Sequence, residues 1–397
     1  MARRSVITLD EAWDRLLSSI VPLEAEQVPV DESGGRYLRE PLIARRTQPY
    51  ADLSAMDGFA ASGEGPWSLI GEARAGHAFG GALAPGQAVA ISTGAALPEG
   101  ADRIVVKEDA SVAQSGLQAD PPPTPGRHIR RRGFDFETGD TLLIAGTRMA
   151  APHIALARTA GIGTIGVTRR PRVGILECGD ELCADPMDCP PDGLPASNGS
   201  MTARMVGSVG AEVASRVLVR DRVESVLDAL DAANDADLIL TSGGASVGDH
   251  DLIKPALERA GFTLDFWRVA IRPGKPLIVA RRGAQLMLGL PGNPVSTFVT
   301  AYLFALPALR RMAGATSALP QPIRLPLAGS LAEGGTRREF MRARISRQSV
   351  VPIEERDSSA LAALAEADVL IDRPIHAPAE TEGALVPCYL LEHGAIA

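Results

Sequence analysis

The feature that most restricts the fold of this chain is an alternation of apolar and amphipathic segments between residues 172 and 312. Apolar residues recur with helical spacing over 199–209 and 223–234, and these stretches separate short apolar runs of strand length. The runs are RVGILE (172–177), AEVASRVLV (211–219), ADLILTS (236–242) and AQLMLGL (284–290). Alternating strands and helices are typical of a parallel sheet covered by helices on both faces. We therefore predict an α/β domain with a sheet of the parallel type.

Three loops that follow predicted strands carry glycines or acidic residues. They are ECGDEL (177–182), TSGGASVGDHD (241–251) and LGLPGNPVS (288–296). In an open parallel sheet, ligands bind beyond the carboxyl ends of the strands, which is where these loops are expected. Glycines in the second loop allow backbone amides to approach phosphate oxygens, and Asp249 and Asp251 follow as possible Mg²⁺ ligands.

The third loop has the features of an anion site at the start of a helix. Pro294 occupies a position where its missing N–H costs nothing, and Asn293 and Ser296 lie at the positive end of the following helix. The nearby segment IRPGKP (271–276) places Arg272 and Lys275 three residues apart across a Pro-Gly turn. Cations beside glycine loops and carboxylates predict a site for a phosphate or oxyanion together with a divalent metal.

Each of these motifs also has a purely structural interpretation. A Gly-Gly pair is commonly only a turn, and Asp180 and Glu181 can cap a following helix. The functional interpretation is favoured because several such loops fall at one end of the same predicted sheet. No segment matches the G-x₄-G-K-[ST] phosphate loop or a G-x-G-x-x-G motif after the first strand, which disfavours ordinary NTPases and dinucleotide enzymes.

Outside this α/β part, the sequence predicts a different pattern of secondary structure. Thr8 and Glu11 form a capping box that predicts a helix from residue 9. From about residue 48, β-like runs broken by Gly and Pro predict a small β-rich region, and 149–162 predicts a short helix. A last group of β-like runs begins after residue 322.

Composition restricts the partners and the location of the protein. The formal net charge is −8, which argues against a broad nucleic-acid or anionic-membrane surface. No apolar run reaches the length of a membrane span, and the N-terminus lacks the apolar core of a secretory signal. We therefore expect a cytoplasmic protein whose four cysteines are ordinary free thiols.

An ordered series of motifs resembles the molybdopterin molybdenumtransferase family, the molybdenum insertases that include the C-terminal part of gephyrin. The motifs cover nearly the whole chain and follow the order of the family: QPYADLSAMDGFA (48–60), ISTGAALPEGADRIVVKED (91–109), RRGFDFETGD (131–140), RRPRVGILECGDEL (169–182), SGGASVGDHD (242–251), IRPGKP (271–276) and GLPGNPVS (289–296). Any one of them is weak evidence, whereas the ordered series is specific.

The resemblance implies a fold of four domains in an elongated homodimer. These are a helical domain from 1–47 and 140–170, an inserted β-rich domain from 48–139, a molybdopterin-binding α/β domain from 171–317 and a C-terminal β domain from 318–397. The resemblance also implies a reaction in which molybdate is inserted into adenylylated molybdopterin with Mg²⁺-dependent release of AMP. From the resemblance we also expect transient contact with molybdopterin adenylyltransferase, cofactor-modifying enzymes or apo-molybdoenzymes.

The resemblance assigns roles to individual residues of this chain. Those implied to be catalytic are Asp57, Thr93, Asp135, Glu181 and Asp249. Those implied to bind the pterin and AMP phosphates are Gly243, Gly244, Ser246, Gly248, Gly292, Asn293 and Ser296. Those implied to bind molybdate are Arg272, Lys275, Arg337 and Ser358. Those implied to hold Mg²⁺ are Asp221, Asp249 and Glu181.

The chain departs from the family pattern at a few positions. Arg272 stands where the family usually has Lys, Cys178 where it has Thr, and Phe134 where an acidic residue is common. The Gly and Gln that usually surround the matching serine are missing around Ser358. Two alternatives to an insertase are molybdopterin adenylylation, the preceding step, and a non-catalytic molybdopterin or molybdate scaffold. The flanking regions 1–168 and 319–397 argue against the first, and the carboxylates of the loops argue against the second.

Overall fold

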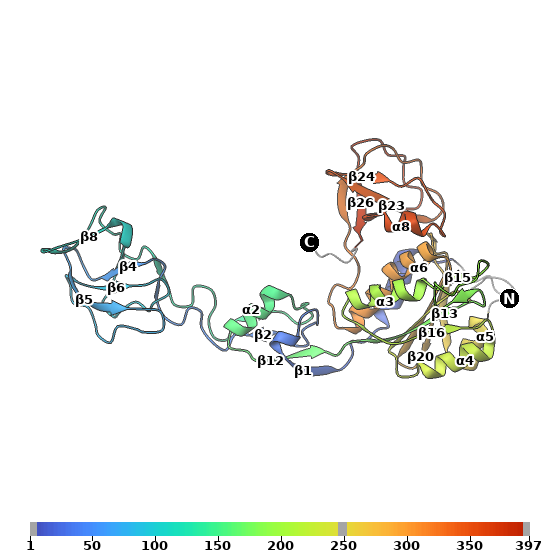
Figure 1. The fold of residues 1–397 in the computed structure, drawn as a ribbon, viewed down its shortest axis with the longest axis horizontal. Coiled ribbons are helices and arrows are strands. Elements are labelled where there is room, and N and C mark those ends of the chain that lie inside the picture. The colour runs from blue at the N-terminus through green and yellow to red at the C-terminus, as the bar shows by residue number, and fades with distance from the viewer. Residues whose placement is uncertain (1–5, 245–251, 392–397) are drawn as a thin grey trace.

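The computed structural model describes residues 6–244 and 252–391, and it shows an elongated molecule (Figure 1). A β-rich region forms one end, and a small region around helix α2 (Ala151–Thr159) lies in the middle. The α/β region forms the other end, with the C-terminal β region beside it. Within the described residues, no helix combines the length and apolar character needed to cross a membrane.

The α/β region is built on a six-stranded sheet with the strand order β16-β13-β17-β21-β20-β18. Its strands are β13 (Arg172–Cys178), β16 (Glu212–Val219), β17 (Leu238–Ser242), β18 (Thr263–Arg268), β20 (Pro276–Arg282) and β21 (Gln285–Leu290). The neighbours β16, β13, β17 and β21 are parallel, as the sequence pattern predicts. Two short strands, β14 (Leu182–Cys183) and β15 (Leu194–Pro195), pair outside this sheet.

The sheet is mixed rather than wholly parallel, because β20 runs antiparallel to both β21 and β18. The reason is local. Arg282 pairs with Gln285, so Gly283 and Ala284 form a two-residue turn, in which Gly283 has a φ of 60°. A turn of this length joins antiparallel strands, whereas parallel strands need a long crossover.

Helices cover both faces of the sheet. They are α1 (Leu9–Ser18), α3 (Asn198–Ser208), α4 (Val223–Ala232), α5 (Ile253–Arg259), α6 (Pro294–Thr300), the π-helical turn η3 (Ala301–Ala305) and α7 (Leu306–Met312). Alternate residues of β17 face opposite sides, so Leu240 packs with α1, α3, α6 and α7, whereas Ile239 packs with α4 and α5. The prediction of helices on both faces is therefore confirmed.

Helix α1 begins as its capping box predicts, since Thr8 Oγ1 accepts a hydrogen bond from the Glu11 N–H at 3.2 Å. Its apolar face packs into the core of the α/β region, where Trp13 Nε1 donates to the Leu303 carbonyl at 2.7 Å. We predicted that this N-terminal helix belongs with the helical domain. In the structure, it packs against the α/β sheet instead.

The middle and β-rich regions are small and separately packed. The middle one contains β1 (Ala25–Pro29), the 3₁₀ turn η1 (Val30–Glu32), β2 (Leu42–Ile43), β11 (Thr141–Leu143), α2 and β12 (Thr164–Thr168). The β-rich one contains β3 (Leu53–Ser54), β4 (Gly58–Ala61), β5 (Ser68–Ala73), β6 (Gln87–Ile91), β7 (Arg103–Val106), the 3₁₀ turn η2 (Lys107–Asp109), β8 (Ala110–Ala113), β9 (Gly116–Ala119) and β10 (Ile129–Arg130). Each has its own cluster of buried apolar side chains.

The C-terminal region is a sheet with the strand order β19-β23-β25-β26-β22, with β24 paired to β23. Its elements are β22 (Ile323–Pro326), β23 (Arg338–Ser346), β24 (Ser349–Pro352), α8 (Leu361–Ala365), β25 (Val369–Arg373) and β26 (Leu385–Leu390). One edge strand, β19 (Ile271–Arg272), comes from the α/β part of the chain. The two regions therefore share a backbone ladder.

A buried carboxylate fixes the start of α3. Glu177, which is only 3% exposed, accepts hydrogen bonds from the N–H groups of Asn198 at 2.9 Å and Gly199 at 2.8 Å. Glu177→Gln is expected to lower the free energy of unfolding by about 1–3 kcal/mol, because one charged acceptor becomes an amide donor that faces an N–H. Urea denaturation measures this loss. The matched control is Glu212→Gln at an exposed position on β16, and an equal loss in both variants would contradict the capping role.

Candidate active site

Two adjoining cavities lie where the α/β sheet meets the C-terminal region. The cationic pocket has a volume of about 1030 Å³ and is lined by Arg272, Lys275 and Arg337. The acidic pocket has a volume of about 440 Å³ and is lined by Glu181 and Asp221. Both are lined by Gly243, Gly244, Gly292 and Asn293, so they form one continuous cleft.

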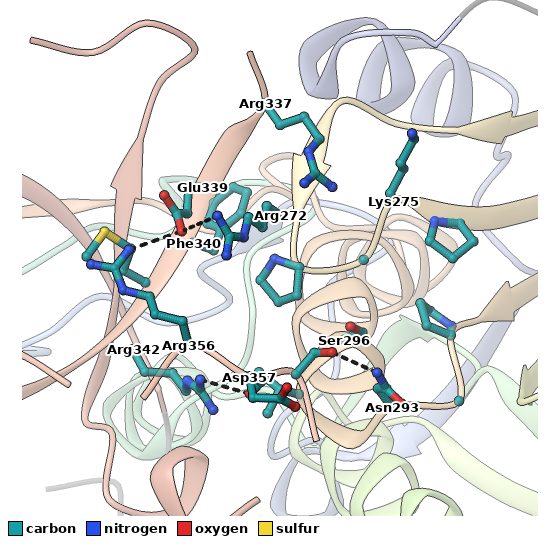
Figure 2. A pocket seen from close by; sticks show the side chains of 18 of the residues that line it. Arg272, Lys275, Asn293, Ser296, Arg337, Glu339, Phe340, Arg342, Arg356 and Asp357 are labelled. Carbon is teal, nitrogen blue, oxygen red and sulfur yellow. Dashed lines mark hydrogen bonds and ion pairs between the residues drawn. The ribbon is translucent and has the colours of Figure 1, made fainter. Parts of the chain in front are cut away.

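Strand pairing assembles the cationic pocket from distant parts of the chain. β19 pairs in parallel with the start of β23, which sets Arg272 opposite Glu339. The Arg272 guanidinium lies 3.7 Å from the Glu339 carboxylate, and the Arg356 guanidinium lies 3.2 Å from the same carboxylate. Figure 2 shows Arg272, Lys275 and Arg337 around one cleft. The predicted grouping of the two cations of IRPGKP in one pocket is confirmed.

Lys275 and Arg337 differ from Arg272 in having no ion pair with any carboxylate among the described residues. No carboxylate of the described chain therefore neutralises their positive charges by a direct ion pair. The turn that carries Lys275 requires glycine at position 274, because Gly274 has a φ of 100° and a Cβ there would lie 2.5 Å from Thr300 Cγ2. The backbone of this turn is thus packed closely against the helix that starts at Pro294.

The start of α6 forms the wall beside these cations. Pro294 is the first helical residue, as predicted, and Asn293 is the N-cap. Asn293 Nδ2 donates to Ser358 Oγ at 2.7 Å, and the Val295 N–H donates to the Ser358 carbonyl at 3.1 Å. These bonds bring Ser358 of the C-terminal region to the pocket. Ser296 of α6 also lines the pocket and is 6% exposed.

Sequence reasoning missed five charged residues of the cationic pocket: Glu339, Arg342, Glu355, Arg356 and Asp357. Arg342 is 5% exposed and donates to the carbonyls of Ala360 at 3.0 Å and Asp357 at 3.1 Å, so it holds the loop that carries Ser358. Burial lowers the pKa of the Arg342 guanidinium. The only available signal was the alternation of polar residues along β23, which does not reveal the long-range pairing with β19.

The acidic pocket contains two of the predicted carboxylates, Glu181 and Asp221, and Asp221 is tied to the neighbouring Asp180. The Asp221 N–H donates to Asp180 Oδ1 at 3.3 Å, and the Asp180 N–H donates to Asp221 Oδ2 at 3.4 Å. Partial desolvation raises the pKa of the Asp221 carboxyl, the Asp180 N–H lowers it, and the charges of Asp180 and Glu181 raise it further. The alternative in which Asp180 and Glu181 cap a helix is wrong, because β14 follows them.

Gly243 lines both pockets, and steric contact requires a glycine at this position. Gly243 has a φ of 79°, and a Cβ there would lie 2.2 Å from the Cys178 carbonyl oxygen. The chain can therefore pass close to the end of β13 only without a side chain at this position. The predicted residues Ser246, Gly248 and Asp249 lie outside the described residues.

Three predicted residues do not line this cleft in the described chain. Asp57 and Thr93 belong to the β-rich region at the opposite end of the molecule (Figure 1), and Asp135 directly precedes Phe136, which packs in the apolar cluster of the middle region. Asp57 Oδ1 accepts hydrogen bonds from the Thr93 N–H at 2.7 Å and the Thr93 hydroxyl at 3.0 Å, which lower the pKa of the Asp57 carboxyl. Asp57 and Thr93 are thus one exposed unit, and the exposed Asp135 follows Phe134, which is 78% exposed.

Three family models match successive parts of the chain. They are the MoeA N-terminal region (domain I and II) over residues 7–161, a probable molybdopterin binding domain over 174–311, and the MoeA C-terminal region (domain IV) over 324–391. The cationic pocket therefore lies between the second and third matched regions, which contain Lys275 and Arg337 respectively.

Curated relatives match over most of their length. The molybdopterin molybdenumtransferase of Haemophilus influenzae is 32% identical over 78% of this chain and 78% of its own. That of Synechococcus elongatus is 34% identical over 89% of this chain and 92% of its own. The chain belongs to the molybdopterin molybdenumtransferase family. The resemblance inferred from the motifs is thereby confirmed.

The molybdopterin molybdenumtransferase family membership agrees with the fold. A solved structure of the molybdopterin biosynthesis MoeA protein from Pyrococcus horikosii superposes with a TM-score of 0.80. It is 26% identical and the match covers 97% of this chain and 99% of that one. The predicted multidomain architecture, with an α/β domain and a C-terminal β domain, is confirmed.

Proposed function

We propose that this protein inserts molybdenum into molybdopterin, with adenylylated molybdopterin and molybdate as substrates and AMP as a product. The observation that carries the proposal is the single cleft in which the cations Lys275 and Arg337, neither paired with a described carboxylate, adjoin the carboxylates Glu181 and Asp221. Molybdate is a dianion, so it suits the cationic pocket. A phosphoanhydride needs charge neutralisation when it is cleaved, which both pockets can help to provide.

The side chains of the cationic pocket bind and orient rather than react covalently. Lys275 and Arg337 supply positive charge, and the start of α6 adds the positive end of a helix. Ser358 Oγ accepts a hydrogen bond from Asn293, so its own proton is free to be donated to an oxyanion in the pocket. The hydrogen bonds that Arg342 donates to the loop hold the Ser358 hydroxyl in place before the substrate binds. Substrate binding therefore does not need to order this loop.

The acidic pocket offers Mg²⁺ only part of a coordination shell, which phosphate oxygens of the substrate would complete. No group of three metal-binding side chains occurs among the described residues. Mg²⁺ in nucleotide sites commonly takes one or two carboxylates together with phosphate oxygens. Glu181 and Asp221 meet this requirement, whereas the third carboxylate of the pocket, Glu177, accepts the N–H groups at the start of α3. Glu181 and Asp221 would hold the ion, and Asp249 is the third predicted ligand. When bound, Mg²⁺ supplies charge neutralisation at the anhydride.

The proposal includes a homodimer, and the separation of the predicted residues supports it. Asp57 and Thr93 lie in the β-rich region and Asp135 lies next to the middle region's core, and none of them lines the cleft of its own chain. In a homodimer, the β-rich region of one protomer can approach the cleft of its partner. The exposed side chains of Phe134 and Tyr50, 78% and 57% accessible, suit such a contact.

Subunit complementation tests this arrangement. Asp57→Asn and Lys275→Ala variants are each expected to be nearly inactive, whereas a co-refolded mixture should regain a substantial part of the activity. The reason is that a mixed dimer contains one cleft with both residues intact. The activity is measured as AMP release per dimer, and self-mixed variants serve as controls. A mixture no more active than its components would reject the shared cleft.

The proposed function is tested by incubation with adenylylated molybdopterin, Mg²⁺ and molybdate. We expect AMP release that depends on molybdate and disappears when EDTA removes Mg²⁺. Formation of the adenylylated pterin from ATP and molybdopterin would instead assign the preceding step. Binding of molybdopterin without either reaction would assign a scaffold.

A further inference from the structure

Two of the four cysteines lie side by side next to the acidic pocket. A Cβ at Gly193 would lie 2.7 Å from Cys183 Sγ and 3.0 Å from Cys189 Sγ, so both sulfur atoms pack against the space that the missing side chain leaves. All four cysteines are free thiols, and this pair is partly exposed to solvent. The other two, Cys178 and Cys388, are 5% and 0% exposed. The chain therefore has one accessible pair of thiols and two enclosed thiols.

Two tight turns bring the accessible thiols together. The Asp188 N–H donates to the Asp185 carbonyl at 3.3 Å, which reverses the chain between the two cysteines. In a second turn, the Gly193 N–H donates to the Pro190 carbonyl at 2.9 Å and returns the chain to the two sulfur atoms. The backbone of this loop thus holds the pair in place without help from a bound group.

The local environment separates the roles of the thiols. Burial raises the pKa of the Cys178 thiol to about 12 and that of the Cys388 thiol to about 11, so both stay protonated and enclosed. The hydrogen bond with Cys183 raises the pKa of the Cys189 thiol to about 11. Since the thiolate is the reactive form, Cys183 is the member of the pair that reacts first with an oxidant.

We propose that Cys183 and Cys189 form a redox-modification site, at which a peroxide closes the two thiols to a disulfide beside the acidic pocket. Cys183 attacks a peroxide oxygen and becomes a sulfenic acid, and the other oxygen leaves as water when the peroxide is hydrogen peroxide. Cys189 then attacks the sulfenic sulfur and forms the S–S bond, while its proton and the sulfenic hydroxyl leave as a second water. One hydrogen peroxide molecule is reduced for each disulfide formed.

The disulfide changes a wall of the acidic pocket. Leu182 and Leu194 line this pocket, and they are paired across β14 and β15. Cys183 follows Leu182 on β14, and Glu181 directly precedes this strand. Drawing Cys183 from contact into a covalent bond with Cys189 therefore shifts the strand that positions Glu181. The expected effect on turnover rests on the proposed function, in which Glu181 holds Mg²⁺.

Thiol counting tests the disulfide without any substrate. After treatment with hydrogen peroxide and denaturation, the wild-type protein is expected to retain two of its four free thiols, and dithiothreitol should restore all four. Tandem mass spectrometry should place the cross-link between positions 183 and 189. Cys189→Ser should instead accumulate a sulfenic acid at Cys183, which dimedone traps. The matched control Cys388→Ala removes an enclosed thiol and should still form the cross-link.

Activity measures the consequence for the pocket. Molybdate-dependent AMP release by the oxidised wild type is expected to be at least about threefold slower than by the reduced protein, because small displacements of positioning groups slow catalysis. Dithiothreitol should restore the rate. The Cys183→Ser/Cys189→Ser double variant should keep its rate after the same treatment, which also controls for oxidation elsewhere, for example at Met187, which is 88% exposed.

The thiol count and the rate can each contradict the inference. Four free thiols after peroxide treatment, or thiol loss without a cross-link between positions 183 and 189, would overturn the redox site. A cross-linked protein with an unchanged rate of AMP release would overturn its effect on the acidic pocket. AMP release by the reduced wild-type protein would still support the proposed function in either case.

Discussion

Replacing both Lys275 and Arg337 with alanine is expected to raise the KM for molybdate by about 10²- to 10⁴-fold, since each charge-assisted contact contributes about 1.5–3 kcal/mol. These two side chains line the cationic pocket and have no ion pair with a described carboxylate. Removing them therefore leaves no described carboxylate without its partner, so the rise in KM measures the lost contacts with the anion. Molybdate-dependent AMP release at varied molybdate concentration measures the effect.

A matched control separates local binding from a change in overall charge. Arg324→Ala removes a cation from an exposed position on β22, outside the cationic pocket. Its KM for molybdate should stay within about twofold of the wild type, because exposed charges at a distance are screened by salt. A double variant with the KM of Arg324→Ala would place the molybdate site elsewhere.

Removing the carboxylate of Asp372 is expected to have the largest effect on stability. Asp372 is 3% exposed and accepts two hydrogen bonds from Arg338, at 2.8 Å from Nε and 2.6 Å from Nη2. Arg338 also reaches Asp10 of α1 at 3.1 Å, so the pair lies between the C-terminal region and the α/β core. Asp372→Ala should lower the free energy of unfolding by about 3–5 kcal/mol, because it leaves a largely buried guanidinium without its main partner.

The control for this variant is an exposed ion pair in the same region. Glu366 lies 3.7 Å from Arg344, and both side chains are more than half accessible to solvent. Glu366→Ala should change the free energy of unfolding by no more than about 1 kcal/mol. Urea denaturation of both variants gives the comparison. A similar small loss for Asp372→Ala would show that the buried pair does not hold the two regions together.

Local periodicity was sufficient to predict most of the α/β sheet. The predicted strands at 172–177, 211–219 and 236–242 correspond to β13, β16 and β17 within a few residues. The apolar content of β13 and β17 reflects burial on both faces, whereas β16 is an edge strand that stays largely exposed. β20 escaped prediction because its apolar run begins at the IRPGKP turn, and because its direction depends on a two-residue turn rather than on composition.

The cleft could be predicted only in part. Glycines, carboxylates and the start of α6 occupy the carboxyl ends of parallel strands, so their grouping follows from topology. Glu339, Arg342 and Arg356 reach the cleft through the pairing of β19 with β23, which joins segments far apart in the chain. In the proposed homodimer, the place of Asp57, Thr93 and Asp135 in the reaction depends on a second copy of the chain, and no local pattern encodes that.

The pairing of β19 with β23 also limits how the enzyme can admit its substrates. The Arg338 N–H donates to the Ala270 carbonyl at 2.9 Å, so backbone bonds tie the IRPGKP segment to the C-terminal sheet. A hinge motion that parted the two regions at this edge would break that ladder. On the other side of the pocket, the contact at Ser358 consists of one side-chain bond from Asn293 and one backbone bond from Val295. The ladder thus fixes the backbone of Arg272 relative to that of Arg337, so the two guanidinium groups are held by one sheet rather than by two separate domains.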